Sequence, residues 1–378
     1  MGILSLIRRE LANAFLHDAR RAIFLFGAAT AYLILFGILY YPGVVKEIPT
    51  VVCDEEHTAY SRLLTRQVDD DERLGLVRVV ADEEKARAML RRKEAYAAVI
   101  IPADFSHDIL NGRSANVLFM LNGANIITTN IATTAGNDII NTFNTRFAAR
   151  QAALRTSGDE QLLKKRIAPI ETTLRVLNNP TQSYMMFFMV GLAMAAMQQG
   201  IFLAVGAAVQ GDFKDRDGLK GAPKVAVLAV KVAVYWVLSV LSFALVCVIS
   251  AFLGIPDRAS VTALLAIASA FSFAAVSLGL FASSLFHNEL QFVRASIMYT
   301  VPAFIFGGYT WPLESMDPVT QVVAQAFPMA WMSNAVRDLF LSGHLTTLNE
   351  NLTALTVMGV IFLSLGSWIF LHKMNKMA

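Results

Sequence analysis

The stretch that decides the fold of this chain is Ile305-Phe306-Gly307-Gly308-Tyr309-Thr310-Trp311-Pro312-Leu313-Glu314-Ser315-Met316-Asp317-Pro318. It interrupts an apolar run that begins at Ala295 and that otherwise suits a membrane-spanning helix. Two glycines and a proline break that helix, and the backbone groups they free need partners because the hydrocarbon core holds no water. Such a break is tolerated only where it is packed in protein or lines a cavity. The stretch therefore predicts a polytopic membrane protein with one interrupted span.

The residues after the break predict two short helices. Asp317-Pro318 is typical of an N-cap followed by proline at the first helical position. Four apolar residues then share one helical face, which favours a helix lying on a surface: Val319, Val322, Val323 and Ala326. Pro328 ends this helix, and a second one is expected from Ala330 to Leu341, before Gly343. A plain loop is the simpler alternative, but this ordered series disfavours it.

The order of these residues resembles the fifth-span region of ABC-2 type permeases, the membrane subunits of ABC exporters. Six residues match the family's glycine-aromatic-proline turn and its later methionine, proline, arginine and glycine: Gly308, Pro312, Met316, Pro328, Arg337 and Gly343. Asp317 departs from the pattern, since the family more often has proline directly after the methionine. The resemblance implies re-entrant and surface helices over residues 307–343. It implies an outer gate there that also includes Gly307, Tyr309 and Trp311.

The composition is that of an integral membrane protein. Hydrophobic residues make up 55% of the chain and charged residues 16%, against roughly 25% charged in soluble domains. The charged stretches mix both signs, which excludes a nucleic-acid-binding face. Cys53 and Cys247 do not form a disulfide framework or a metal site, and the six histidines are scattered singly. The sequence has no phosphate-binding loop and no hydrolase or metalloprotease motif, so we expect no enzyme, metal or bound cofactor in this chain.

Apolar segments predict about six spans, each near the 20 residues or so that a bilayer requires. They are residues 22–41, Ser183–Val209, Val225–Ala251, Ala259–Phe286, Ala295–Phe306 with its broken extension, and Leu352–Leu371. Residues 1–21 precede them as an amphipathic interfacial helix, with Ile3, Ile7, Leu11, Ala14 and Phe15 on its apolar side and Arg8, Arg9 and Glu10 elsewhere. The fold class is therefore an α-helical polytopic membrane protein, with residues 183–378 holding spans two to six.

Residues 42–182 differ sharply in composition and predict an α/β domain inserted between the first and second spans. The expected strands are Thr50–Cys53, Leu76–Val80, Tyr96–Ile101, Asn116–Leu121 and a returning strand at Thr172–Leu177. The expected helices are His57–Val68, Asp82–Arg92, Ala103–Asn111 and a long one from Asn125 to about Leu154. The residues leave open whether this domain docks or gates, or is only a spacer.

Basic residues near the span ends predict the orientation. One side has Arg8, Arg9, Arg20, Arg21, Lys214, Arg216, Lys220, Lys224, Arg294, Lys373 and Lys376. The other, much longer side has Lys46, Arg175, Arg258 and Arg337 at the span ends. The positive-inside rule therefore places both termini in the cytoplasm and the α/β domain outside. The family resemblance implies that the membrane is a bacterial cytoplasmic (inner) membrane.

The span cores contain essentially no ionisable residue, and Lys231 lies close enough to the cytoplasmic end to snorkel. A carboxylate relay for ion-coupled transport is therefore poorly supported. Another energy source is suggested by the loop at residues 210–224, which resembles the family's ATPase-coupling loop. Its candidate coupling residues are Asp212, Phe213, Lys214, Asp215, Arg216, Asp217, Gly218 and Leu219. Leu219 follows Gly218 where the family commonly has threonine, and a solvated charged loop is the alternative.

The resemblance implies the permease subunit of an ATP-driven exporter. It implies a second permease chain, in a homodimer or heterodimer, and separate ABC ATPase subunits that bind ATP and magnesium. It also implies contact with membrane lipids, a periplasmic adaptor protein as a further partner, and a drug-like or lipid-like hydrophobic substrate. Two other classes stay open on the residues alone: a carrier driven by an ion gradient, and a membrane receptor or scaffold whose outer domain binds a ligand.

Overall fold

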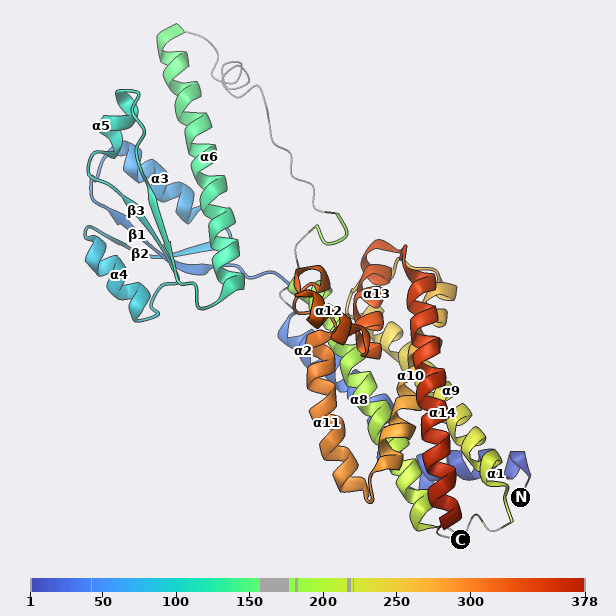
Figure 1. Cartoon of the computed structure of the whole chain (residues 1–378). Helices are drawn as coiled ribbons and strands as arrows, with labels where there is room; N and C mark the ends of the chain where they lie inside the picture. The colour runs from blue at the N-terminus through green and yellow to red at the C-terminus, as the bar shows by residue number, and fades with distance from the viewer. Residues whose placement is uncertain are drawn as a thin grey trace. The chain divides into compact units, whose positions relative to one another are not determined.

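The computed structural model describes residues 2–41, 43–156, 177–180, 183–215, 219 and 221–376 (Figure 1). The chain divides into two units. The helical unit comprises Met1–Gly43 and Val176–Ala378, and the α/β unit comprises Val44–Arg175. The insertion of an α/β domain after the first span, as the sequence predicts, is confirmed.

The α/β unit is built on a four-stranded sheet with the order β2-β1-β3-β4. The strands are β1 (Ile48–Asp54), β2 (Leu74–Val80), β3 (Ala97–Ile101) and β4 (Leu118–Leu121). β1 pairs in parallel with β2 and β3, whereas β4 pairs antiparallel to β3. The two central strands, β1 and β3, are covered on both faces. This explains why their residues are mostly apolar in succession and do not alternate between apolar and polar.

Helices cover both faces of this sheet. They are α3 (Ala59–Asp69), α4 (Glu83–Arg91), α5 (Phe105–Leu110) and α6 (Ile126–Thr156). Residues of α3, α5 and α6 form one core with Val52 and Val99, and Ala86 and Met89 of α4 form the other with Val51. The four described strands and four helices agree with the sequence prediction to within about two residues at most ends. Apart from Leu177, the expected returning strand lies outside the described residues.

The helical unit contains α1 (Ile3–Ala12), a short π-helix (Asn13–His17), α2 (Arg20–Leu39), α8 (Tyr184–Lys214), α9 (Lys224–Phe252), α10 (Val261–Leu285), α11 (Glu289–Phe306), α12 (Pro318–Gln325), α13 (Pro328–Ser342) and α14 (Leu348–Lys376). In the described part of the chain, five helices are long and apolar enough to cross a membrane: α2, α8, α9, α10 and α14. The remaining expected span, the fifth in chain order, corresponds to α11, which has 18 residues and ends at the break.

α8 lies at the centre of the helical unit and contacts α2, α9, α10, α11 and α13. Close approach is possible because small residues occupy the contacts. A Cβ at Gly200 would overlap the carbonyl oxygen of Phe24 in α2, and a Cβ at Gly206 would overlap the ring of Phe292 in α11. Backbones packed at this distance are typical of helices that associate inside a bilayer.

Candidate functional site

The break after α11 satisfies its backbone groups through α13. The Gly307 carbonyl accepts hydrogen bonds from Ser333 Oγ at 2.8 Å and from Asn334 Nδ2 at 3.2 Å. Gly308 has φ of +73°, a conformation that glycine adopts without strain. A Cβ on Gly308 would lie 2.5 Å from Leu313 Cγ and 2.7 Å from Asn334 Nδ2. The turn is therefore packed in protein, as the sequence requires of a broken span.

Tyr309 attaches this turn to α8. Its side chain is 1% exposed and lies among the rings of Phe187, Phe188 and Phe304. Its hydroxyl donates to the Phe187 carbonyl and accepts the Gly191 N–H at 3.1 Å. Phe187 and Gly191 are four residues apart in α8, so the hydroxyl joins two groups of the helix's own hydrogen-bond ladder. A Cβ at Gly191 would overlap the Tyr309 ring, which explains the glycine there.

Arg337 of α13 completes this cluster. Its guanidinium carbon lies 5.0 Å from the centre of the Tyr309 ring and 5.2 Å from that of Phe187, a cation–π arrangement. Its Nη2 also donates to Asn334 Oδ1 at 2.9 Å. Glycine, tyrosine and arginine residues that lie up to 30 positions apart in the sequence therefore meet around one turn. We call Gly307, Gly308, Tyr309 and Arg337 the turn cluster.

The remaining predicted gate residues lie in the segment after the turn and at the two ends of α13. Trp311 is 59% exposed, Pro312 is also exposed, and Met316 is half-buried. Pro328 begins α13 at its first turn, and Gly343 ends that helix with φ of +85°. Gly343 thus ends α13 as predicted, whereas Pro328, which the sequence suggested as the end of the preceding helix, is the first residue of α13.

Asp317 caps α12 as the sequence predicts. Its Oδ1 accepts the N–H groups of Val319 and Thr320, both at 3.1 Å, and its Oδ2 accepts the Thr320 hydroxyl. The hydrogen bond from the Thr320 hydroxyl, with those from the two amides, lowers the pKa of Asp317 below its ordinary value. Val319 and Val322 are exposed, so α12 keeps an uncovered apolar face that suits a membrane surface.

The predicted coupling loop begins later than the sequence suggested. Asp212, Phe213 and Lys214 belong to the last turn of α8, which ends at Lys214. Gln210 is buried, and its Nε2 donates to the Ser283 carbonyl at 2.8 Å. Asp215 follows the helix, and Leu219 is buried. Arg216, Asp217 and Gly218 lie outside the described residues. The expectation of a loop starting at residue 210 is therefore wrong.

The expectation that Lys231 snorkels to the membrane surface is also wrong. Lys231 is 1% exposed, and its Nζ lies 2.8 Å from Glu10 Oε1 of α1 and 3.0 Å from Asp212 Oδ2 of α8. It also donates to the Ala208 carbonyl at 3.2 Å. Lys231 therefore donates two hydrogen bonds inside the protein and pairs by charge with Asp212. Glu10 and Asp212 are each 2% exposed, so Glu10 does not belong to a solvated face of α1.

Arg9 extends this group of charged residues. We call Arg9, Glu10, Asp212 and Lys231 the ionic cluster. Arg9 places Nη1 3.5 Å from Asp212 Oδ1 and Nη2 3.1 Å from Asp215 Oδ2. The cluster holds two cations and two carboxylates. A nearby ion pair joins Arg21 to Asp18 at 3.2 Å.

Asp18 lies just before α2. A hydrogen bond from Arg20, with the charges of Arg20 and Arg21, holds the pKa of Asp18 below its usual value.

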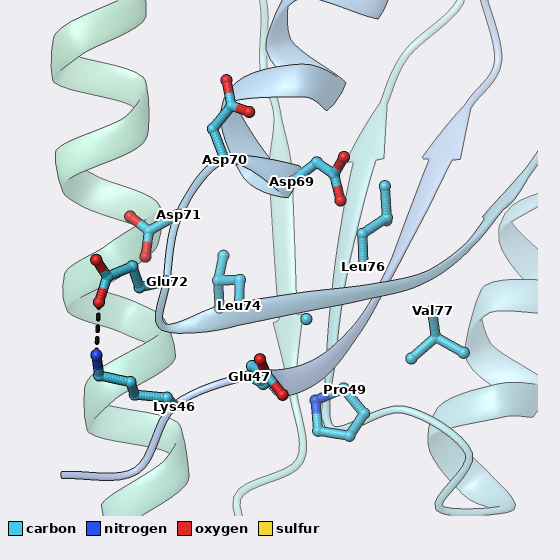
Figure 2. Close-up of a pocket in the computed structure, with 11 residues that line it drawn as sticks. Lys46, Glu47, Pro49, Asp69, Asp70, Asp71, Glu72, Leu74, Leu76 and Val77 are labelled. Atoms are coloured by element: carbon cyan, nitrogen blue, oxygen red, sulfur yellow. Dashed lines mark hydrogen bonds and ion pairs between the residues drawn. The ribbon is translucent and has the colours of Figure 1, made fainter.

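The α/β unit has a surface hollow of about 740 Å³ beside β2 (Figure 2). Asp69, Asp70, Asp71 and Glu72 line it from the turn between α3 and β2, together with Lys46, whose Nζ lies 2.6 Å from Glu72 Oε2. In the described residues, no group of three or more histidine, cysteine or acidic side chains could hold a metal ion. The hollow is acidic and open.

Two apolar grooves lie in the helical unit. One, of about 760 Å³, is lined by α9, α10 and α14, and includes Trp236 and Phe273. The other, of about 460 Å³, lies between α1 and α9 and is lined only by apolar residues, among them Ile7 and Val234. Both grooves suit hydrocarbon rather than water.

Known proteins resemble this chain in sequence. The family described as ABC-2 family transporter protein matches residues 21–368. The chain is 27% identical over 145 residues to the probable multidrug ABC transporter permease YbhS of Escherichia coli strain K12, and equally to the protein of that name in Escherichia coli O157:H7. The aligned part covers 38% of this chain and 38% of each relative. Because the family match extends over more than half of its residues, the chain belongs to the ABC-2 family of transporter proteins.

Proposed function

We propose that this permease subunit works in an ATP-driven exporter of hydrophobic molecules. An ABC-2 permease domain has no ATPase site of its own, and membership of the family implies a partner ATPase and a dimer in general. The single observation that carries the proposal is the family match across the spans. In the proposed complex, separate ATPase subunits bind ATP and magnesium, and two permease chains enclose the pathway.

The proposed substrate class is drug-like or lipid-like. It is supported by the printed name of the relatives, which calls them probable multidrug permeases. It is also supported by the two grooves, whose lining is almost wholly apolar. The methionines at the start of α8 support it less, because Met189, Met194 and Met197 are buried in the core of the unit.

We propose that both termini are cytoplasmic and that the α/β unit is extracytoplasmic, available to an adaptor protein. The distribution of charge supports this orientation. Lys224, at the start of α9, donates to the Met374 carbonyl near the end of α14 at 2.9 Å. Lys373 of α14 lies 5.6 Å from the centre of the Phe213 ring at the end of α8. Basic residues of α9 and α14 thus gather at the end of the helical unit where α8 ends, and Arg9 of α1 pairs with Asp212 there.

At that end we propose that the segment from Asp215 to Pro223 docks on the ATPase. It joins α8 to α9, so a push on this segment would tilt both helices. At the opposite end of α8, Tyr309 would pass the tilt to the turn cluster, which we propose as part of the outer gate. Lipid-facing helices would follow as rigid bodies.

A carrier driven by an ion gradient is the second candidate. The observation that favours it is the ionic cluster, because buried carboxylates within spans are often proton sites. The cluster's equal number of cations and carboxylates argues against it, since each carboxylate already faces a cation. Dependence on ATP rather than on a proton gradient separates the two candidates.

Arg216→Glu is expected to weaken binding of the ATPase. Reversing one charge of the docking segment places a repulsive contact in the proposed interface. The measurement is co-purification of the permease with the ATPase encoded beside it, followed by the rate of ATP hydrolysis. Arg258→Glu, on the opposite side of the membrane in this orientation, is the matched control and should bind normally. Equal retention of the ATPase by both variants would contradict this assignment of the loop.

A further inference from the structure

We propose that Lys231 is a positioning residue for transport, which ties α1 to both helices that flank the docking segment. This inference rests on the proposed function and adds to it a mechanical role for the ionic cluster. The docking segment leaves α8 at Asp215 and enters α9 at Lys224. A movement of that segment is useful only if α8 and α9 respond together.

The contact between α1 and α9 leaves an open apolar groove. Ile3, Ile7 and Leu11 of α1 face α9 across the apolar groove of about 460 Å³, which their side chains do not fill. Ile3 is 66% exposed and Leu4 is 80% exposed, so the first turn is bound by few contacts. Leu6 of α1 is 2% exposed and packs in the core of the helical unit, so the charged residues of α1 add a second attachment to this apolar one.

Arg9 and Glu10 are adjacent in α1, and each pairs with a different one of the two helices that flank the docking segment. Arg9 pairs with Asp212 and Asp215 at the end of α8. Glu10 pairs with Lys231, two turns into α9. Lys231 also reaches back to Asp212, so the ionic cluster closes a loop of contacts through α1, α8 and α9.

The environment makes these contacts stiff. The side chains of Glu10, Asp212 and Lys231 are only 2–3% exposed, so water cannot replace a lost partner. Lys231 donates to Glu10 of α1 and to the Ala208 carbonyl of α8, and it also forms an ion pair with Asp212 of α8. Separating α1 from α9 would leave a buried carboxylate unpaired, whereas moving all three helices together leaves every pair intact. The favourable motion is therefore a joint one.

The test is a double variant, Glu10→Gln with Lys231→Met, in the full complex with its ATPase. It removes one charge of each sign, so Asp212 keeps Arg9 as a partner while the ionic tie between α1 and α9 is lost. We expect the variant to fold, bind the ATPase and hydrolyse ATP. Because coupling between sites typically amounts to about 5- to 150-fold, we expect transport per ATP hydrolysed to fall at least about fivefold.

The matched control is Arg20→Gln with Glu289→Gln. This pair also joins two helices, at 3.8 Å, but Arg20 is 63% exposed. Its loss should leave transport per ATP at the wild-type value. A purely structural role for Lys231 would lower the yield of folded protein but not this ratio. A wild-type ratio in the Glu10→Gln, Lys231→Met variant would overturn the proposal.

Two further measurements cover the case in which the double variant folds poorly. Glu10→Gln alone preserves shape and leaves Lys231 paired with Asp212, and it should also lower transport per ATP. Backbone amide exchange in α1, measured without ATP, should be faster in Glu10→Gln than in wild type, while α8 and α9 keep their protection. Unchanged amide exchange in α1 would show that the Glu10–Lys231 ion pair does not attach α1 to α9. Absence of ATP-driven transport in the wild type would instead refute the proposed function.

Discussion

Gly308→Leu is expected to abolish export while the ATPase still binds and hydrolyses ATP. Gly308 has φ of +73°, where a side chain costs about 1–2 kcal/mol. In addition, its Cβ would lie 2.5 Å from Leu313 Cγ and 2.7 Å from Asn334 Nδ2. Asn334 donates a hydrogen bond to the Gly307 carbonyl and accepts one from Arg337, so its displacement would disturb the whole turn cluster. The docking segment at the other end of α8 would be unaffected.

The comparison variant is Gly254→Leu. Gly254 also has positive φ, at +74°, but nothing lies within 4 Å of the position of its Cβ. It therefore carries the backbone strain without the collision. We expect Gly254→Leu to retain most export, with its amount of folded protein only slightly reduced. If both leucine variants exported equally well per folded molecule, the turn cluster would have no part in the gate.

Lys231→Met alone is expected to be the most destabilising of these substitutions. It leaves Glu10 without the cation that pairs with it at 2.8 Å, and in the described residues Glu10 Oε2 already has no hydrogen-bond partner. Removing one partner of a buried ion pair typically costs about 3–5 kcal/mol. That is a large part of the total stability of about 5–15 kcal/mol that proteins possess. The measurement is the midpoint of unfolding of the purified permease in detergent.

The comparison residue for this prediction is Lys224, in the same helix. Its Nζ donates to Met374 O and Asn375 Oδ1 near the end of the helical unit, where water can replace it. Lys224→Met should therefore cost no more than about 1.5 kcal/mol. Adding Glu10→Gln to Lys231→Met should recover stability, because the unpaired charge disappears. Additive losses in that pair would show that the two residues are not coupled.

The local parts of the fold follow from the sequence. Asp317-Pro318 predicts the cap of α12, and Gly343 predicts the end of α13, because the backbone conformation at these positions depends on adjacent residues. The strands of the α/β unit are likewise visible as short apolar runs between turn signals. Gly307 and Gly308 mark the break in α11 for the same reason.

The contacts between distant segments do not follow from the sequence. Lys231 and Glu10 are 221 residues apart, and each looks alone like a charge near the end of a helix. Asp212 looked like part of a solvated loop, because nothing nearby in the sequence shows that Gln210 is held by Ser283. Tyr309 was singled out as an aromatic residue of the turn, but its insertion between Phe187 and Gly191 requires the packing of α8. The only signal of the ionic cluster in the sequence is Lys231, a lysine inside an apolar span.

The central claim is that this chain forms a pathway in the membrane that a separate ATPase drives. The most direct measurement is uptake of a fluorescent hydrophobic dye into inside-out proteoliposomes containing the permease and its ATPase. The account predicts uptake that needs ATP and magnesium and that stops when the ATPase is replaced by a variant that binds but does not hydrolyse ATP. Uptake driven by a proton gradient with the ATPase omitted would contradict it.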